Sequence, residues 1–463
     1  MDMRLPSWLV ITAAIAAAAI AILLGALLLM PPRPLILDAG FRPETITPNA
    51  DGSDDITEFT YVLSRNADIT IALEGEDGQI FTFRQDARRI ADEYHVNFSG
   101  VVDGYVAPNE EISGEVLRRL MPDGVYTWRL SAVAENGEQD ERTGVLTIRE
   151  GDAPLPEITA FDIEPRIFTP NQDGISDRTQ INVFTTKPSE LTVYLLGQDD
   201  QMIFIPPRVE NARPGEAGMH PYDYEGGVDR NADPPPDGEY TVVALARDAV
   251  GQEVQQTGSL TIERGGKPYG QITPQANGAT VVFSSAPWEA RFASDRDQLG
   301  ESIEEPNDPQ DLNLNTLTFP VGDMLIFKLT VENVGRVPLR TTGPVPGTVY
   351  DWTQRAATFG LYDESGAWRI GIDCTTAASD YPWRWALGTD DVLITETDPV
   401  TDETFQYLPV GATSVVWGAI RMSVLEARNP QNCWAGLIHE DVGVPNQNIG
   451  PRSIELAVVG DDA

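Results

Sequence analysis

The sequence has little positive charge. Its 463 residues include 71 acidic side chains but only 32 lysines and arginines, which gives a formal net charge of −39. Nucleic acids are polyanions, and proteins bind them through basic surfaces that release counterions. Nucleic-acid binding through the bulk of this surface is therefore excluded.

The sequence also has few of the residues that build catalytic or metal sites. Its three histidines, His95, His220 and His439, are far apart, and no His-Glu-x-x-His, Cys-x-x-Cys, Gly-x-Ser-x-Gly, Walker or dinucleotide-binding glycine motif occurs. The signatures of zinc proteases, zinc ribbons, esterases and nucleotide sites are thus missing. His439-Glu440-Asp441 could bind a metal, but a single histidine beside two carboxylates is more often a surface ion pair, which we expect here. The sequence predicts a protein that is not an enzyme and needs no cofactor, since an enzyme would need a site assembled from distant residues.

One long apolar run is present, and it extends without a charged side chain from Trp8 to Met30. As a helix it would span about 34 Å, enough for a bilayer core of about 30 Å. It is longer than the apolar core of a cleavable signal peptide and lacks a small-x-small cleavage site. We therefore expect residues 1–34 to form a short cytoplasmic tail and a retained single-pass anchor, with the rest of the chain extracytoplasmic.

A repeat organises the first two thirds of the chain. Thr-Pro-Asn-x-Asp-Gly-x-x-Asp stands at Thr47–Asp55 and again at Thr169–Asp177. Each copy is followed by Pro-Asp-Gly-x-Tyr, at Pro122–Tyr126 and at Pro236–Tyr240. The first copy carries extra residues around 107–120, where we expect a short helix.

Apolar side chains alternate with polar ones within each copy, as in Ile69, Ile71 and Leu73. This period of two is typical of strands with one buried face. Several such strands per copy, separated by Gly, Asp and Pro turns, predict an antiparallel β-sandwich. The two separated motifs resemble those of Ig-like modules in the bacterial flagellar hook-capping protein and in gliding-motility surface proteins. The resemblance covers residues 41–150 and 158–264 and implies a display or assembly role without catalytic residues.

The repeated loops allow two interpretations. Asn, Asp and carbonyl oxygens at alternate positions resemble half of a calcium site. Alternatively, the same side chains cap backbone amides in Asx turns. The residues concerned are Asn49, Asp51 and Asp55 in the first copy and Asn171, Asp173 and Asp177 in the second.

The last third differs from the repeat. A polar stretch at 294–315 is expected to be a solvated loop, and alternation resumes at Leu325, Phe327 and Leu329. The segment from Phe319 to Gly335 resembles the opening strands of cell-adhesion-related bacterial Ig-like repeats, over about half of the domain. The likeness implies a third Ig-like sandwich with insertions.

This last third holds the aromatic and cysteine candidates. Tyr381, Trp383 and Trp385 either stack against a sugar or peptide at the surface or fill the core. Cys374 and Cys433 are the only cysteines. In an oxidising compartment we expect them to form a disulfide, the alternative being two unrelated thiols.

Together these patterns predict an all-β chain with an N-terminal transmembrane helix and three Ig-like sandwiches, at residues 35–152, 153–266 and 267–463. We expect a membrane-anchored scaffold or adhesion protein of a bacterial envelope, with a protein or a surface glycan as partner. Two alternatives stay open. One is a glycan-binding module on a stalk; the other is an accessory subunit of a membrane complex, in which small residues of the anchor such as Ala13 and Ala17 pack on other helices.

Overall fold

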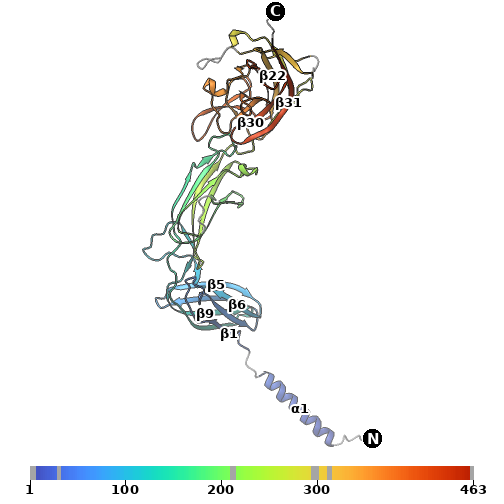
Figure 1. The fold of residues 1–463 in the computed structure, drawn as a ribbon. Coiled ribbons are helices and arrows are strands. Elements are labelled where there is room, and N and C mark those ends of the chain that lie inside the picture. The colour runs from blue at the N-terminus through green and yellow to red at the C-terminus, as the bar shows by residue number, and fades with distance from the viewer. Residues whose placement is uncertain (1–6, 29–32, 209–214, 293–301, 310–314, 459–463) are drawn as a thin grey trace, which may run out of the picture.

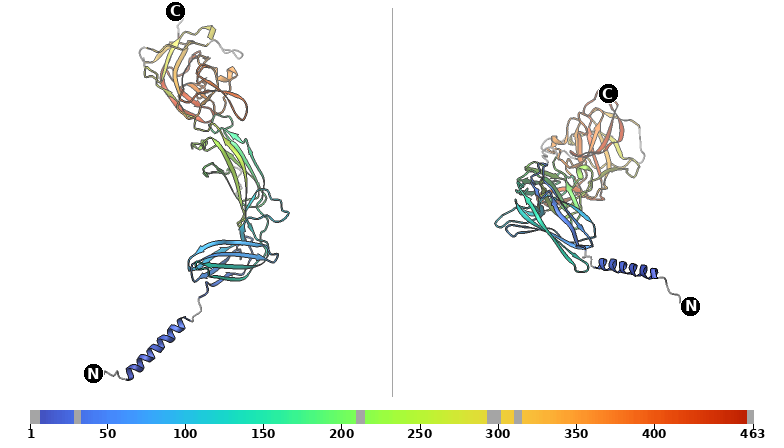
Figure 2. Two further views of the ribbon diagram at one scale, coloured as in Figure 1. Left: turned by 180° about the vertical axis from the view of Figure 1, so that it is seen from behind. Right: turned by 90° about the horizontal axis from the view of Figure 1, so that it is seen from below.

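The protein is elongated, with a helix at its N-terminal end and three β-sandwich domains in a row (Figure 1). The computed structural model describes residues 7–28, 33–208, 215–292, 302–309 and 315–458. Two further views show the same succession of domains, with the third domain farthest from the helix (Figure 2).

Helix α1 (Ser7–Leu28) stands apart from the sandwiches in all three views (Figures 1 and 2). Its described side chains are exposed, including Trp8, Ile15 and Ile22. Over the part of the chain that the structure describes, no helix combines the length and the apolar character needed to cross a bilayer. The structure thus gives no support to the expected transmembrane span, whose last two residues, 29 and 30, lie outside the described residues.

The first domain packs a three-stranded sheet, β1-β3-β6, on a five-stranded sheet, β2-β10-β9-β4-β5. Buried residues alternate along β4, where Ile69, Ile71 and Leu73 face the core as predicted. The strands are β1 (Ile36–Arg42), β2 (Thr45–Ile46), β3 (Thr57–Leu63), β4 (Ala67–Gly75), β5 (Ile80–Arg89), β6 (Glu93–Phe98), β9 (Gly124–Ala134) and β10 (Gln139–Ile148).

The extra residues of the first copy form a hairpin instead of the expected short helix. Its strands are β7 (Val101–Asp103) and β8 (Glu115–Leu120), and β8 pairs with β18 of the second domain. The prediction was wrong because β8 obtains backbone partners from a strand far away in the sequence. Local propensity does not contain that information.

The second domain repeats the architecture of the first. It packs β11-β13-β16 on a sheet of order β15-β14-β17-β18, which the β8-β7 hairpin extends and to which β12 adds beside β18. The strands are β11 (Ile158–Glu164), β12 (Ile167–Phe168), β13 (Thr179–Thr185), β14 (Glu190–Leu196), β15 (Met202–Ile205), β16 (Gly218–Tyr224), β17 (Gly238–Arg247) and β18 (Glu253–Ile262), with a 3-10 turn η2 (Val228–Arg230).

The third domain is a larger sandwich. One sheet has the order β19-β22-β29-β24, with β20 also beside β22, and the other has the order β21-β31-β30-β25-β23-β28-β27, with β26 beside β25. The strands are β19 (Gly270–Thr273), β20 (Val281–Ala286), β21 (Leu317–Pro320), β22 (Met324–Asn333), β23 (Leu339–Thr341), β24 (Val349–Asp351), β25 (Trp368–Cys374), β26 (Trp383–Ala386), β27 (Ile394–Thr397), β28 (Thr404–Leu408), β29 (Thr413–Arg421), β30 (Gln431–His439) and β31 (Gly443–Ala457), with 3-10 turns η3 (Ala290–Phe292) and η4 (Ala356–Phe359).

Where it is described, the polar stretch at 294–315 is mostly exposed, as expected for a solvated loop, with Ile303 as the buried exception. Ile303 is buried, and its carbonyl oxygen accepts a hydrogen bond from Nε1 of Trp417 at 3.0 Å. The acidic residues 295, 297, 301 and 311 of this stretch lie outside the described residues.

Candidate functional site: the joints between the domains

The two repeated loops share most of their internal hydrogen bonds. In the first, both carboxylate oxygens of Asp55 accept backbone N–H groups, from Ala50 at 2.7 Å and from Gly52 at 2.8 Å, and Asn49 Oδ1 accepts the amide of Asp51 at 3.0 Å. These contacts are Asx turns that hold the loop by its own amides. Among the described residues, no group of three or more His, Cys, Asp or Glu side chains is arranged to hold a metal ion.

The second loop repeats most of these bonds, but Asp173 N–H donates to Asp177 Oδ1, whereas in the first loop Ala50 N–H donates to Asp55 Oδ1. Asp177 accepts the amides of Asn171, at 3.2 Å, and Gly174, at 2.7 Å, and Asn171 Oδ1 accepts the amide of Asp173 at 3.0 Å. The two loops therefore have one local structure, and any difference in their roles comes from what surrounds them.

The first loop is exposed to solvent, and the second is buried by another domain. Residues 50–54 of the first loop are exposed, whereas Asn171 and Asp173 are only 4% and 5% exposed. The cover is the third domain: the hydroxyl of Tyr407 donates to Asp173 Oδ2 at 3.0 Å, and His439 Nε2 lies 2.7 Å from the carbonyl oxygen of Gln172. The second loop is thus docked into the third domain, which buries it.

The contact between this loop and the third domain depends on two glycines. A Cβ atom on Gly174 would lie 1.9 Å from the carbonyl oxygen of Ser365, and one on Gly366 would lie 2.1 Å from the backbone carbon of Asp173. Both glycines also have positive φ angles. The backbones therefore touch directly, with no room for a side chain between them.

Charged groups complete this joint. Arg264, at the end of the second domain, donates to Glu396 at 3.0 Å and to the Thr397 carbonyl at 3.1 Å. Ser176 Oγ lies 3.3 Å from Asp398 Oδ1, which also organises its own turn by accepting the amide of Thr401. The link at Gly265-Gly266 is therefore flanked by specific contacts between the two domains.

Burial in the joint changes the pKa values of its acids and its histidine. Burial, together with the charge of Asp173, raises the pKa of Asp177 to about 7, and burial also raises the pKa values of Asp173 and Glu440. Burial lowers the pKa of His439 to about 4. In the exposed first loop, slight burial acts to raise the pKa of Asp55, but amide hydrogen bonds outweigh it and the pKa is lowered.

The shifted pKa values of the acids and of His439 make docking of the two domains depend on pH in opposite directions. A carboxyl whose pKa is raised on docking favours docking at low pH and loses this effect as pH rises toward its docked pKa. A histidine whose pKa is lowered favours docking above its ordinary pKa and loses the effect as pH falls toward its docked pKa. The acids and His439 therefore oppose each other between about pH 4 and 6.5.

Specific hydrogen bonds and an ion pair also fix the joint between the first and second domains. Gln252 is completely buried; its Nε2 donates to the carbonyls of Asp152 and Pro154 at 3.0 and 2.9 Å, and its Oε1 accepts the amide of Leu120 at 3.1 Å. The Nζ of Lys187 pairs with Asp152 at 2.7 Å. The link at 151–156 is therefore tied to both domains, and the β7-β8 hairpin adds backbone pairing.

Sequence reasoning missed most of these residues. The expectation of a surface ion pair at His439-Glu440-Asp441 was wrong in its location: His439 is buried at the joint beside Gln172, and Glu440 is buried in an ion pair with Arg384 at 2.7 Å. Gly174 lies inside the repeated motif, so the sequence carries a signal for it. Tyr407, Gly366 and Gln252 carry no sequence signal of their own.

The aromatic candidates do not form a surface site. Trp383 and Trp385 are 1% and 0% exposed, and Trp385 packs edge-on against Phe327 and Tyr350 at ring distances of 4.6 and 4.9 Å. Tyr381 is 7% exposed. Of the two interpretations, the structure supports core packing over ligand stacking, since the two tryptophans face the space between the sheets, where aromatic rings contribute most to stability.

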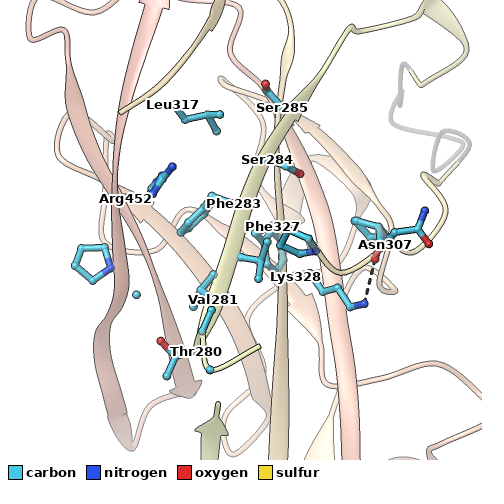
Figure 3. Close-up of a pocket in the computed structure, with 17 residues that line it drawn as sticks. Thr280, Val281, Phe283, Ser284, Ser285, Asn307, Leu317, Phe327, Lys328 and Arg452 are labelled. Atoms are coloured by element: carbon cyan, nitrogen blue, oxygen red, sulfur yellow. Dashed lines mark hydrogen bonds between the residues drawn. The ribbon is translucent and has the colours of Figure 1, made fainter. Parts of the chain in front are cut away.

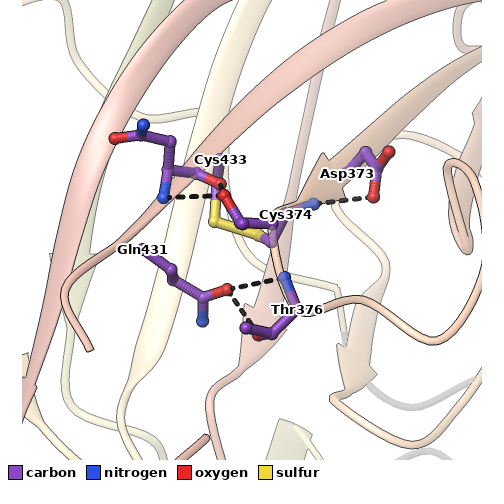
Figure 4. Close-up of a disulfide and its surroundings, with 7 residues drawn as sticks. Asp373, Cys374, Thr376, Gln431 and Cys433 are labelled. Carbon is purple, nitrogen blue, oxygen red and sulfur yellow. Dashed lines mark hydrogen bonds between the residues drawn. A yellow bond between two sulfur atoms is a disulfide. The ribbon is translucent and has the colours of Figure 1, made fainter. Parts of the chain in front are cut away.

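Cys374 and Cys433 form a disulfide between the paired strands β25 and β30 (Figure 4). Next to it, Gln431 Oε1 accepts the hydroxyl of Thr376 at 2.6 Å. The bridge ties the β25–β30 pair together at one end of the third domain.

Comparison with known proteins gives only distant likenesses. No protein-family model matches the chain, and no curated protein sequence does either. Among solved structures, it is similar to a Ca2+-stabilised adhesin with which an Antarctic bacterium binds ice, at 12% identity over 90% of this chain and 72% of that one, with a TM-score of 0.19. It is also similar to the FN1–FN3 domains of chicken CNTN1 (8% identity, 87% of this chain and 95% of that one, TM-score 0.24). A third is a tetra-tandem repeat from the extending region of a large adhesion protein (11% identity, 91% and 100%, TM-score 0.15). At these scores the likenesses carry no argument about function.

Proposed function

We propose that the protein is a surface-exposed spacer that holds its third domain at a fixed distance and direction from its N-terminal helix. The observation that carries the proposal is the docking of the second loop into the third domain, through Asp173, Tyr407 and His439. A chain of independent domains needs no such contact, since flexible links suffice to connect them. Pinned joints are useful where reach and direction matter, as in a structural or adhesion role.

Two further features support an extracytoplasmic location. The Cys374–Cys433 disulfide suits an oxidising compartment. The strongly acidic composition keeps such rods soluble and mutually repelling. The role we propose is structural and needs no catalytic group.

The location is tested by adding protease to intact cells that produce the full chain with an epitope in the third domain. We expect loss of the epitope without cell lysis, and alkylation of Cys374 and Cys433 only after reduction. An epitope that survives until the cells are lysed would contradict the proposal. A cytoplasmic protein of the same cells, which must stay intact, is the control for leakage.

We also propose that α1 attaches the chain to a membrane. Support comes from its 22 residues without a charge and from its exposed apolar side chains, among them Ile15 and Ile20. The test compares membrane retention after carbonate extraction for Ile15→Arg/Ile20→Arg with the matched Ile15→Leu/Ile20→Leu variant. We expect only the arginine variant to be released, because charge within an apolar bilayer segment is costly. Equal retention of both variants would refute the attachment.

A further inference from the structure

Strand β20 (Val281–Ala286) leaves one edge of a sheet open. It pairs with β22 on one side, and no described residue pairs with its other side. Edge strands are usually protected by charged residues, prolines or covering segments, because their free amides and carbonyls invite another strand. β20 contains neither a charged residue nor a proline.

A cavity of about 500 Å³ lies along this open edge (Figure 3). Five consecutive residues of β20, 281–285, line it, together with Leu317 and Arg452. Side chains of neighbouring strand residues point to opposite faces of a sheet, so a cavity lined by all of them lies beside the strand and not on one face. Its volume is in the range of known ligand pockets.

The cavity begins where β31 lies against β20, since a Cβ atom on Gly450 would lie 2.9 Å from Val281. From there the cavity extends past Phe283 toward Ser285 and Leu317 (Figure 3). It thus lies between β20 of one sheet and β21 and β31 of the other.

The cavity presents one cation without a counterion. Lys328 is engaged: its Nζ contacts Asp308 at 2.7 Å and Glu305 at 2.8 Å. The side chain of Arg452 has no hydrogen-bond or ion-pair partner among the described residues, and its Nε is buried and unsatisfied. Burial also lowers the pKa of Arg452. An acidic group entering the cavity would meet this guanidinium.

We propose that β20 accepts an extended peptide of a partner protein as an added strand, with an apolar side chain beside Phe283 and a carboxylate at Arg452. Strand addition of this kind gains affinity from main-chain hydrogen bonds and specificity from pockets for alternate side chains. Beyond Val281, where β31 lies against the strand, the remaining five residues of β20 offer about 17 Å of edge, enough for a short peptide strand. The inference concerns a site separate from the joints and does not rest on the spacer role.

The test uses the full chain and a fluorescein-labelled octapeptide of alternating threonine and valine with one central aspartate. We expect saturable binding by fluorescence anisotropy and slower hydrogen exchange in β20. Arg452→Gln should weaken binding about tenfold, as expected for a charge-assisted contact. Arg452→Lys should retain most of the affinity. Arg428→Gln is the matched control, since Arg428 is an exposed arginine of the same domain, and it should change nothing.

Two modified probes separate strand addition from other binding. The peptide with alternate amides N-methylated should not bind, because it cannot donate to the open edge. The peptide with asparagine for aspartate should bind about tenfold more weakly and be insensitive to Arg452→Gln. The proposal is overturned if no binding occurs up to about 1 mM, if the methylated peptide binds equally, or if Arg452→Gln has no effect while the variant remains folded by thermal unfolding.

Discussion

The repeated loops provide an internal control for the docked joint, through Gly174 and its counterpart Gly52. Both glycines have positive φ angles, +81° and +89°. A Cβ atom on Gly174 would lie 1.9 Å from Ser365 oxygen, whereas a Cβ atom on Gly52 would have nothing within 4 Å. Gly174→Ala and Gly52→Ala therefore share the backbone strain and differ only in the clash with the third domain.

The size of the difference follows from the contacts that undocking breaks. Left-handed strain of about 1–2 kcal/mol is common to both variants and cancels. Undocking removes the bond from Tyr407 to the Asp173 carboxyl, about 1.5–3 kcal/mol if ionised, and that from His439 to Gln172, about 1 kcal/mol. We expect Gly174→Ala to disfavour docking by about 3 kcal/mol more than Gly52→Ala, roughly a hundredfold in the docking equilibrium.

Hydrogen exchange measured by mass spectrometry reports this difference. In Gly174→Ala, the segments of the third domain around Gly366 and Tyr407 should exchange much faster than in the wild type, because the second domain no longer covers them. In Gly52→Ala these segments should be unchanged. The reasoning is refuted if the two variants give the same exchange in the third domain.

Three further predictions concern the same framework. As pH rises from 4 to 7, the docked fraction should fall more steeply in His439→Gln and less steeply in Asp177→Asn than in the wild type. Small-angle scattering measures this fraction, and the same pH profile for both variants would contradict the prediction. Replacing Cys374 and Cys433 by alanine should destabilise the third domain by about 4 kcal/mol, because the bridge closes a loop of 59 residues; a calorimetric transition for this domain at the wild-type temperature would be the opposite result. Gln252→Ala should destabilise the contact between the first and second domains by about 1–3 kcal/mol, because it leaves buried backbone groups unpaired. Hydrogen exchange near residues 115–120 should become faster, and unchanged exchange would count against the prediction.

The sequence predicted the sandwiches because their pattern is local. Alternation at Ile69, Ile71 and Leu73 in the first domain, and at Leu325 and Phe327 in the third, specifies which strand face is buried, and the structure places them there. Such periodicity needs no knowledge of the partner strand. The same locality explains where prediction failed.

The failures are all contacts between distant segments. Strand β8 appeared to be a helix because its partner, β18, belongs to another domain. Trp383 and Trp385 flank an arginine, a pattern that suits a binding surface as well as a core. The two loops are locally alike, so nothing within Thr169–Asp177 indicates that a third domain covers it.

The spacer proposal depends on a single orientation of the second and third domains in solution. Spin labels at Glu239→Cys in β17 and Thr318→Cys in β21, both exposed positions, allow the distance between these domains to be measured in the full chain by double electron–electron resonance. We predict one narrow distance distribution for the wild-type loop and a broad one after Gly174→Ala. A broad distribution with the wild-type loop would contradict the account.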